Sequence, residues 1–198
     1  MSRRLLPHAQ AYWQSILGDR EDIHNHKSTI NDAANSERQD TFILLDAIER
    51  VGLLFRDQDK LDESEKIHRR ALQWYESLLS VEKTSSLGIV GNLGNLYWRQ
   101  CKLAEAEKMY KRALQANENA LSTEHTFTLD TVHNLGHLYT VQGKLAEAEK
   151  MYKRALQGKE KALGAEYTST LDTVNNLGIL YMNQGKLTEA EKICEQVL

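Results

Sequence analysis

A segment of 14 residues, KLAEAEKMYKRALQ, occupies residues 102–115 and recurs unchanged at residues 144–157. The same offset of 42 residues aligns residues 87–128 with residues 129–170, and 28 of the 42 aligned positions are identical. A fixed period of this size is typical of arrays in which one supersecondary unit is stacked on copies of itself. Each unit then buries its apolar face only against its neighbours, so the period constrains the fold more strongly than length or composition does. The blocks lie near residues 45–86, 87–128, 129–170 and 171–198.

The pattern within a block predicts two helices. Apolar or small side chains recur at i, i+3, i+4 and i+7 in the first half of the third block, which places them on one helical face. These residues are Val132, Leu135, Gly136 and Tyr139. Gly143 then interrupts the pattern and is suited to end a helix in the left-handed conformation. Apolar residues resume the same period from Leu145.

The domain organisation follows from these patterns. Residues 1–18 have a helix-period apolar stripe that ends at Gly18, which predicts an N-terminal amphipathic helix. Residues 19–39 are polar and predict a linker, because they can bury little apolar surface. Residues 40–198 form the array. We therefore predict an all-α protein with three full helix pairs and one shortened pair.

The repeated residues resemble the tetratricopeptide repeat, whose pattern is W-x2-L-G-x2-Y followed by A-x3-F. In the third block the matching residues are Val132, Leu135, Gly136, Tyr139, Ala148 and Tyr152. The resemblance implies a right-handed solenoid of antiparallel helix pairs whose first helices line a concave groove. It also implies a protein-binding scaffold without catalytic activity or cofactor.

The 42-residue period is longer than that of the usual tetratricopeptide repeat and resembles the repeats of kinesin light chains. The residues that support this likeness are Asn175-Asn176-Leu177-Gly178, Tyr181, Gly185-Lys186 and Glu189-Ala190-Glu191. The near-identity of the blocks resembles still more the arrays of filamentous-fungal NLR-like proteins. The first likeness implies an adaptor that binds a peptide or protein segment. The second implies a self-association or sensor module of a receptor assembly.

A polar stripe runs beside the apolar stripe of each first helix, about 100° around the helix axis. By resemblance it faces the groove, where an Asn amide can both donate to and accept from a bound peptide backbone. The candidate peptide-binding residues are Asn92, Asn95, Arg99, His133, Asn134, His137, Asn175, Asn176 and Asn183. The alternative is that the recurring Asn residues bond the neighbouring helix. Trp98, beside the stripe, is either a binding anchor or a packing residue.

Composition and charge limit the classes of partner and the cellular compartment that we expect for this chain. The net charge is −3 and both signs are interleaved, which disfavours nucleic acid as a partner. Cys101 and Cys194 do not form a disulfide or metal-ligand pattern, and two unpaired thiols fit a reducing compartment. No apolar run is long enough to span a bilayer. We expect a cytoplasmic protein with protein or peptide partners and no membrane partner.

No constellation of residues indicates catalysis or a metal site. No nucleophile with a base and no phosphate-binding loop stands out. His133 and His137 form an H-x-x-x-H pair that could be half of a zinc site, but no nearby Cys or carboxylate completes it. Glu107 precedes Lys111, and Glu149 precedes Lys153, by four residues; such pairs stabilise a solvated helix face.

Two features depart from the repeat pattern. The glycine of the inner turn is replaced by Asp59 in the first block and by Cys101 in the second. A residue with a Cβ there either adopts a costly positive φ or changes the turn. A terminal repeat normally needs a polar outer face. The shortened fourth pair is instead expected to leave the apolar side chains of Ile193, Val197 and Leu198 exposed. This edge is a candidate site of self-association.

Overall fold

The computed structural model describes residues 36–78 and 87–195 of the 198-residue chain. Every regular element within those residues is an α-helix, so the all-α prediction is confirmed for this part of the chain. The helices are α3 (Ser36–Asp57), α4 (Leu61–Leu78), α5 (Leu87–Arg99), α6 (Leu103–Ala120), α7 (Thr126–Val141), α8 (Leu145–Leu163), α9 (Thr168–Asn183) and α10 (Leu187–Glu195).

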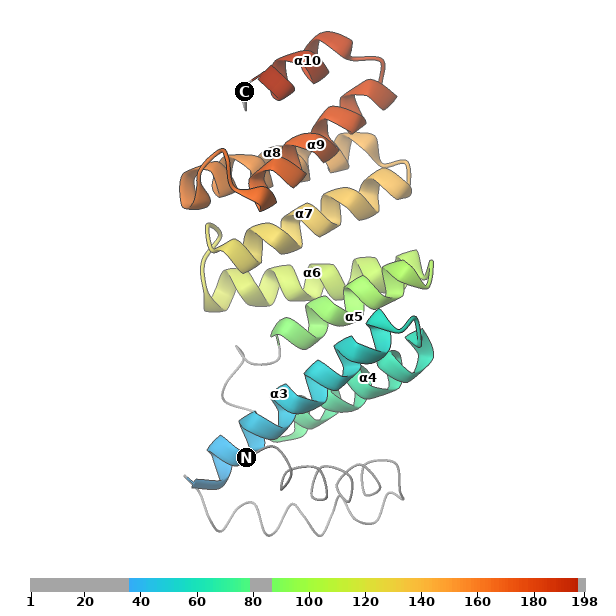
Figure 1. The fold of residues 1–198 in the computed structure, drawn as a ribbon, viewed down its shortest axis with the longest axis vertical. Helices are drawn as coiled ribbons and strands as arrows, with labels where there is room; N and C mark the ends of the chain where they lie inside the picture. The colour runs from blue at the N-terminus through green and yellow to red at the C-terminus, as the bar shows by residue number, and fades with distance from the viewer. Residues whose placement is uncertain (1–35, 79–86, 196–198) are drawn as a thin grey trace. The chain divides into compact units, whose positions relative to one another are not determined.

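The chain divides into two compact units, Met1–Ala47 and Ile48–Leu198. The predicted N-terminal helix at residues 1–18 and most of the predicted linker at residues 19–39 lie outside the described residues. α3 begins at Ser36, so residues 36–39 of that segment are helical. In the second unit the successive helix pairs stack in chain order, as the series α5 to α10 shows in Figure 1.

The core lies between the helices of each pair and between adjacent pairs. Gly94 and Gly136 make the close approach possible, because a Cβ added there would lie 2.6 and 2.9 Å from the rings of Tyr110 and Tyr152. Both rings are almost fully buried. The small-residue and tyrosine positions of the sequence pattern are therefore complementary in shape, which close packing of a protein interior requires.

The four inner turns share one backbone geometry. In the turn after α5, Cys101 N donates to Trp98 O and Lys102 N donates to Tyr97 O, at 3.0 and 2.8 Å. The equivalent bonds recur in the other three turns. The turn residue has a φ of 73° at both glycines, 60° at Asp59 and 58° at Cys101. The first two blocks thus keep the turn and adopt the costly φ.

Ion pairs connect each second helix to the following repeat. Glu65, Glu107 and Glu149 lie 2.8, 3.0 and 2.9 Å from the Nζ atoms of lysines in the next inner turn. Those partners are Lys102, Lys144 and Lys186. The predicted pairs Glu107–Lys111 and Glu149–Lys153 are also present, both at 2.7 Å. Each carboxylate therefore stabilises its own helix and the contact with the next repeat.

The fourth pair is shortened as predicted, since α10 has only 9 residues. Of the three side chains expected to be exposed, Ile193 is half-buried, and Val197 and Leu198 lie outside the described residues. Within the described ranges, no helix combines the length and the apolar character needed to cross a membrane.

Candidate functional site

The recurring Asn residues connect the first helices of adjacent repeats. Asn92 on α5 donates to Glu49 Oε1 on α3 at 2.6 Å. Asn134 on α7 donates to Asn95 Oδ1 on α5 at 3.4 Å. Asn176 on α9 lies 3.2 Å from His133 Nε2 on α7. The polar stripe is thus a series of bonds across the repeat junctions.

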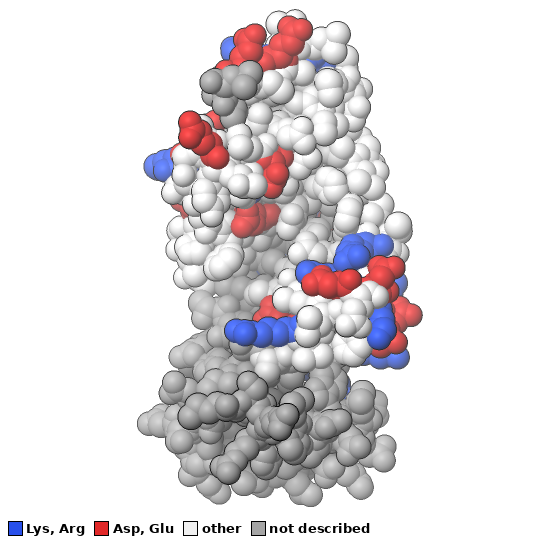
Figure 2. All heavy atoms as spheres, viewed as in Figure 1, with Lys and Arg blue, Asp and Glu red and all other residues white. Residues whose placement is uncertain are grey.

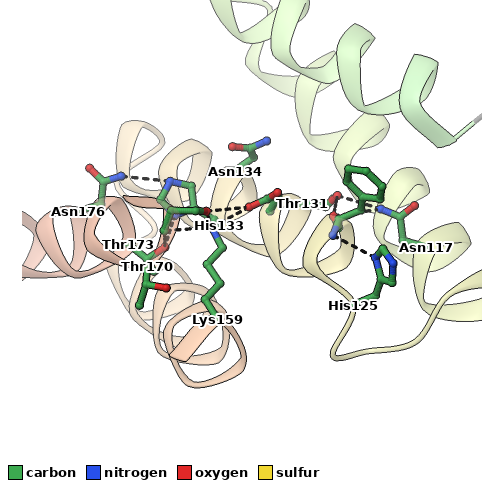
Figure 3. Close-up of polar contacts among 12 residues, drawn as sticks. Asn117, His125, Thr131, His133, Asn134, Lys159, Thr170, Thr173 and Asn176 are labelled. Atoms are coloured by element: carbon green, nitrogen blue, oxygen red, sulfur yellow. Dashed lines mark hydrogen bonds and ion pairs between the residues drawn. The ribbon is translucent and has the colours of Figure 1, made fainter. Parts of the chain in front are cut away.

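The hydrogen bonds of His133 define its tautomer. Its Nδ1 lies 2.9 Å from Thr173 Oγ1, and that hydroxyl donates its single proton to Ser169 O. The hydroxyl must therefore accept from Nδ1–H, which leaves Nε2 unprotonated and able to accept from Asn176. Figure 3 shows the ring between these two partners on α9.

The environment of His133 keeps it neutral. Burial lowers the pKa of its imidazole to about 4, and the ammonium group of Lys159 acts in the same direction. Burial also lowers the pKa of His137. The His137 ring packs against Trp98 of the preceding first helix, with ring centroids 4.9 Å apart. Both imidazoles are therefore uncharged hydrogen-bonding and packing groups at neutral pH.

The other predicted stripe residues differ in how they are engaged. Asn95 Oδ1 accepts from Tyr110 Oη at 2.7 Å as well as from Asn134. Arg99 donates to Arg56 O at 3.1 Å and forms an exposed ion pair with Asp59. Asn175 and Asn183 are exposed, and neither makes a side-chain hydrogen bond to another described residue.

The structure thus places the predicted residues on the first helices and gives most of them a partner inside the chain. Asn92, Asn134 and Asn176 are only half-buried, so each retains amide groups that solvent can reach. The contacts across the junctions are those of the alternative in which Asn bonds the neighbouring helix. Peptide binding by the stripe stays a prediction.

An ion pair between a buried lysine and an exposed aspartate, near the stripe, was not predicted from the sequence. The Lys159 ammonium on α8 is 2% exposed and lies 2.8 Å from Asp130 Oδ1 on α7. It also donates to Ser169 Oγ on α9 at 2.7 Å, so one side chain joins three helices. One period earlier, Asn117 is also buried and donates to Thr131 Oγ1 at 3.1 Å. The only sequence signal was this Asn-to-Lys difference within otherwise similar blocks.

The surface over the first helices has few charged groups. In Figure 2 the surface over α7 and α9 is mostly uncharged and is interrupted mainly by acidic side chains. Asp130 and Asp172 are exposed at the N-terminal part of the stripe. Among the described residues, no group of three His, Cys, Asp or Glu side chains could hold a metal ion, so His133 and His137 gain no third ligand there.

Comparison with protein families gives the same architecture. The model of the tetratricopeptide repeat matches residues 44–115 and 85–161, and a second model of that repeat matches residues 170–198. The chain belongs to the tetratricopeptide repeat family. No curated protein sequence matches the chain.

The fold of the chain is also similar to the folds of solved structures. A P. anserina protein with nearly identical TPR-like repeats, which bears the name kinesin light chain, has a TM-score of 0.71 and 22% identity. That match covers 77% of this chain and 72% of the other. BtubC (BKLC) from P. vanneervenii has a TM-score of 0.72 and 18% identity over 99% of this chain and 74% of its own. The apo form of RapI has a TM-score of 0.70 and 11% identity over 96% of this chain and 66% of its own. At these identities the likeness establishes the fold.

Proposed function

We propose that this tetratricopeptide repeat protein is a non-catalytic scaffold that binds an extended peptide or protein segment along its first helices. The observation that supports the proposal best is the polar stripe of α5, α7 and α9. It offers amide and imidazole groups that remain uncharged at neutral pH. Such groups suit the backbone of a peptide, whose N–H and C=O groups need both acceptors and donors. The name of the P. anserina protein is consistent with a kinesin-light-chain-like adaptor.

The charges favour one class of peptide. Asp130 and Asp172 are the exposed charged side chains of the stripe on α7 and α9, and both are acidic. Lys159 neutralises part of the Asp130 charge, whereas Asp172 has no cationic partner among the described residues. An uncharged or basic segment is therefore favoured over an acidic one.

Selection from a displayed library of random peptides on the intact chain tests the proposal. Selected peptides are then titrated, by fluorescence anisotropy, against wild type and the double variant Asn175→Ala, Asn183→Ala. Loss of two peptide-contacting amides should weaken binding by roughly 5- to 150-fold, since each lost hydrogen bond costs about 0.5–1.5 kcal/mol. Asn119→Ala, an exposed Asn of the second helix α6, is the matched control and should bind as wild type does. Equal affinity of the double variant and wild type would contradict groove binding.

The second candidate function is a self-association or sensor module of an NLR-like receptor assembly. It is favoured by the near-identity of the blocks and by exposed apolar side chains at the α10 end, among them Met182 and Leu187. The encoding gene provides a direct test. A nucleotide-binding domain in the same reading frame would support this candidate, and a kinesin-heavy-chain-binding coiled coil there would contradict it.

A further inference from the structure

Two surfaces of the described repeat array, one on α3 and one on the α9–α10 pair, are complementary in apolar side chains and in charge. The leucines one, two and three periods after Leu54 are 0% exposed; they are Leu96, Leu138 and Leu180. Leu54 on α3 is 59% exposed. Leu54 is therefore exposed at a position that is buried in each later repeat.

The α9–α10 pair presents the opposite surface. Leu61, Leu103 and Leu145, which begin the earlier second helices, are half-buried, whereas Leu187 is 62% exposed. Met182 is 55% exposed at the position that Trp98 occupies two periods earlier. Trp98 packs on His137 of the next first helix, and the residue two periods before His137 is Leu53. Met182 and Leu53 therefore occupy the positions equivalent to Trp98 and His137, whose side chains pack together within the array.

The two residue positions that form the ion pairs between repeats also recur at the α3 and α9–α10 surfaces. Each internal junction joins a Glu of a second helix to a Lys of the next inner turn, at 2.8–3.0 Å. Lys60 is the equivalent lysine one period before Lys102, and Glu191 is the equivalent glutamate one period after Glu149. Both are exposed, and neither has an ion-pair partner among the described residues. The Glu191 carboxylate at the α9–α10 surface is thus complementary to the Lys60 ammonium at the α3 surface.

We propose that the α9–α10 surface binds the α3 surface of a second copy of this chain, so that copies assemble head to tail. Leu54 then occupies the place that Leu96, Leu138 and Leu180 occupy within the chain, and Glu191 pairs with Lys60 of the next copy. Because the two surfaces differ, the contact is heterologous and does not close on itself. The inference rests on the self-association candidate above and is independent of peptide binding by the stripe.

The average mass of the intact chain, measured by sedimentation and light scattering across concentration, tests this arrangement. Wild type should grow in mass continuously with concentration rather than stop at a dimer. Leu54→Asp removes one surface and Leu187→Asp removes the other, and each variant alone should remain monomeric. An equimolar mixture retains one intact surface of each kind, so it should reach the mass of a dimer and no more. Phe127→Asp, at a residue 66% exposed in the middle of the array, is the matched control and should assemble as wild type does.

Three outcomes would overturn the proposal. One is a wild-type chain that stays monomeric at every concentration, as it would if another segment of the chain covered Leu54. The second is a Leu54→Asp variant that still dimerises, which would indicate symmetric contact through α10. The third is a mixture that remains monomeric although both variants have wild-type helical circular dichroism.

A charge exchange keeps the test valid if an apolar variant does not fold. Lys60→Glu and Glu191→Lys should each weaken assembly several-fold, and the double variant should recover it, because the pair is re-formed with exchanged signs. Absence of recovery in the folded double variant would contradict the pairing. Affinity for a selected peptide, measured on the same variants, should not change, which separates this inference from the groove proposal.

Discussion

Replacing Cys101 by glycine should stabilise the array. Cys101 has a φ of 58°, and the equivalent Gly143 has a φ of 73° with the same turn hydrogen bonds. A side chain in this left-handed region costs roughly 1–2 kcal/mol. Glycine removes that cost but gains freedom in the unfolded chain, which offsets about 0.5–1 kcal/mol. The net expectation for Cys101→Gly is a free energy of unfolding about 0.5–1 kcal/mol higher, or roughly 1–4 °C in Tm.

Urea denaturation followed by circular dichroism measures this change. Cys101→Ala removes the thiol but retains the Cβ, so it should match wild type. Gly143→Ala is the reverse experiment: its Cβ would have no neighbour within 4 Å, so any destabilisation reports the backbone alone. We expect a loss of about 1 kcal/mol there. The reasoning is refuted if Cys101→Gly is no more stable than Cys101→Ala while Gly143→Ala is tolerated.

Three further predictions concern packing and charge. Gly94→Ala should lower the free energy of unfolding by roughly 1–3 kcal/mol, because its Cβ would lie 2.6 Å from a buried tyrosine ring. Gly91→Ala, whose Cβ would have no neighbour within 4 Å, should raise it by up to about 1 kcal/mol. The urea midpoints of the two variants measure the difference. Glu107→Gln should cost roughly 1 kcal/mol or less at neutral pH, and exposed Glu105→Gln should be neutral. Hydrogen bonding by a lysine lowers the pKa of Glu107 to about 2. The contribution of the Glu107 carboxylate to the free energy of unfolding is therefore present above about pH 4.5 and is lost as pH falls toward 2. Thermal scans should show this loss in wild type and not in Glu107→Gln. His133→Gln should flatten the decline in stability between about pH 6.5 and 4, because the folded pKa of this histidine is lowered to about 4 and the unfolded chain binds the proton first; an equally steep decline in the variant would contradict this.

The sequence was sufficient for the fold because its strongest signal is repeated. Val132, Leu135 and Tyr139 fall on one helical face, and their counterparts do so in the neighbouring blocks, so independent copies of one pattern agree. The turn at Gly143 was predictable for the same reason. At Cys101 the sequence left two possibilities, a strained φ or a changed turn, and only the backbone geometry distinguishes them.

The details of the candidate site could not be obtained in this way. Placing Asn134 and Asn176 on the stripe needs only helical geometry, but their partners depend on rotamers and on the rotation between adjacent repeats. The burial of Lys159 depends on Ser169 and Asp130 approaching from two other helices. Lys159 and Ser169 break the period, since Asn117 and Phe127 stand one period earlier, so a pattern-based argument had no second copy with which to compare them.

Hydrogen–deuterium exchange of the intact chain, with and without a peptide selected from the displayed library, tests the central claim most directly. Binding along the stripe predicts slower exchange on the first helices α5, α7 and α9, with little change on the outer surfaces of α6 and α8. Protection confined to α6 and α8, by a peptide that binds with measurable affinity, would contradict the claim that the first helices form the binding surface.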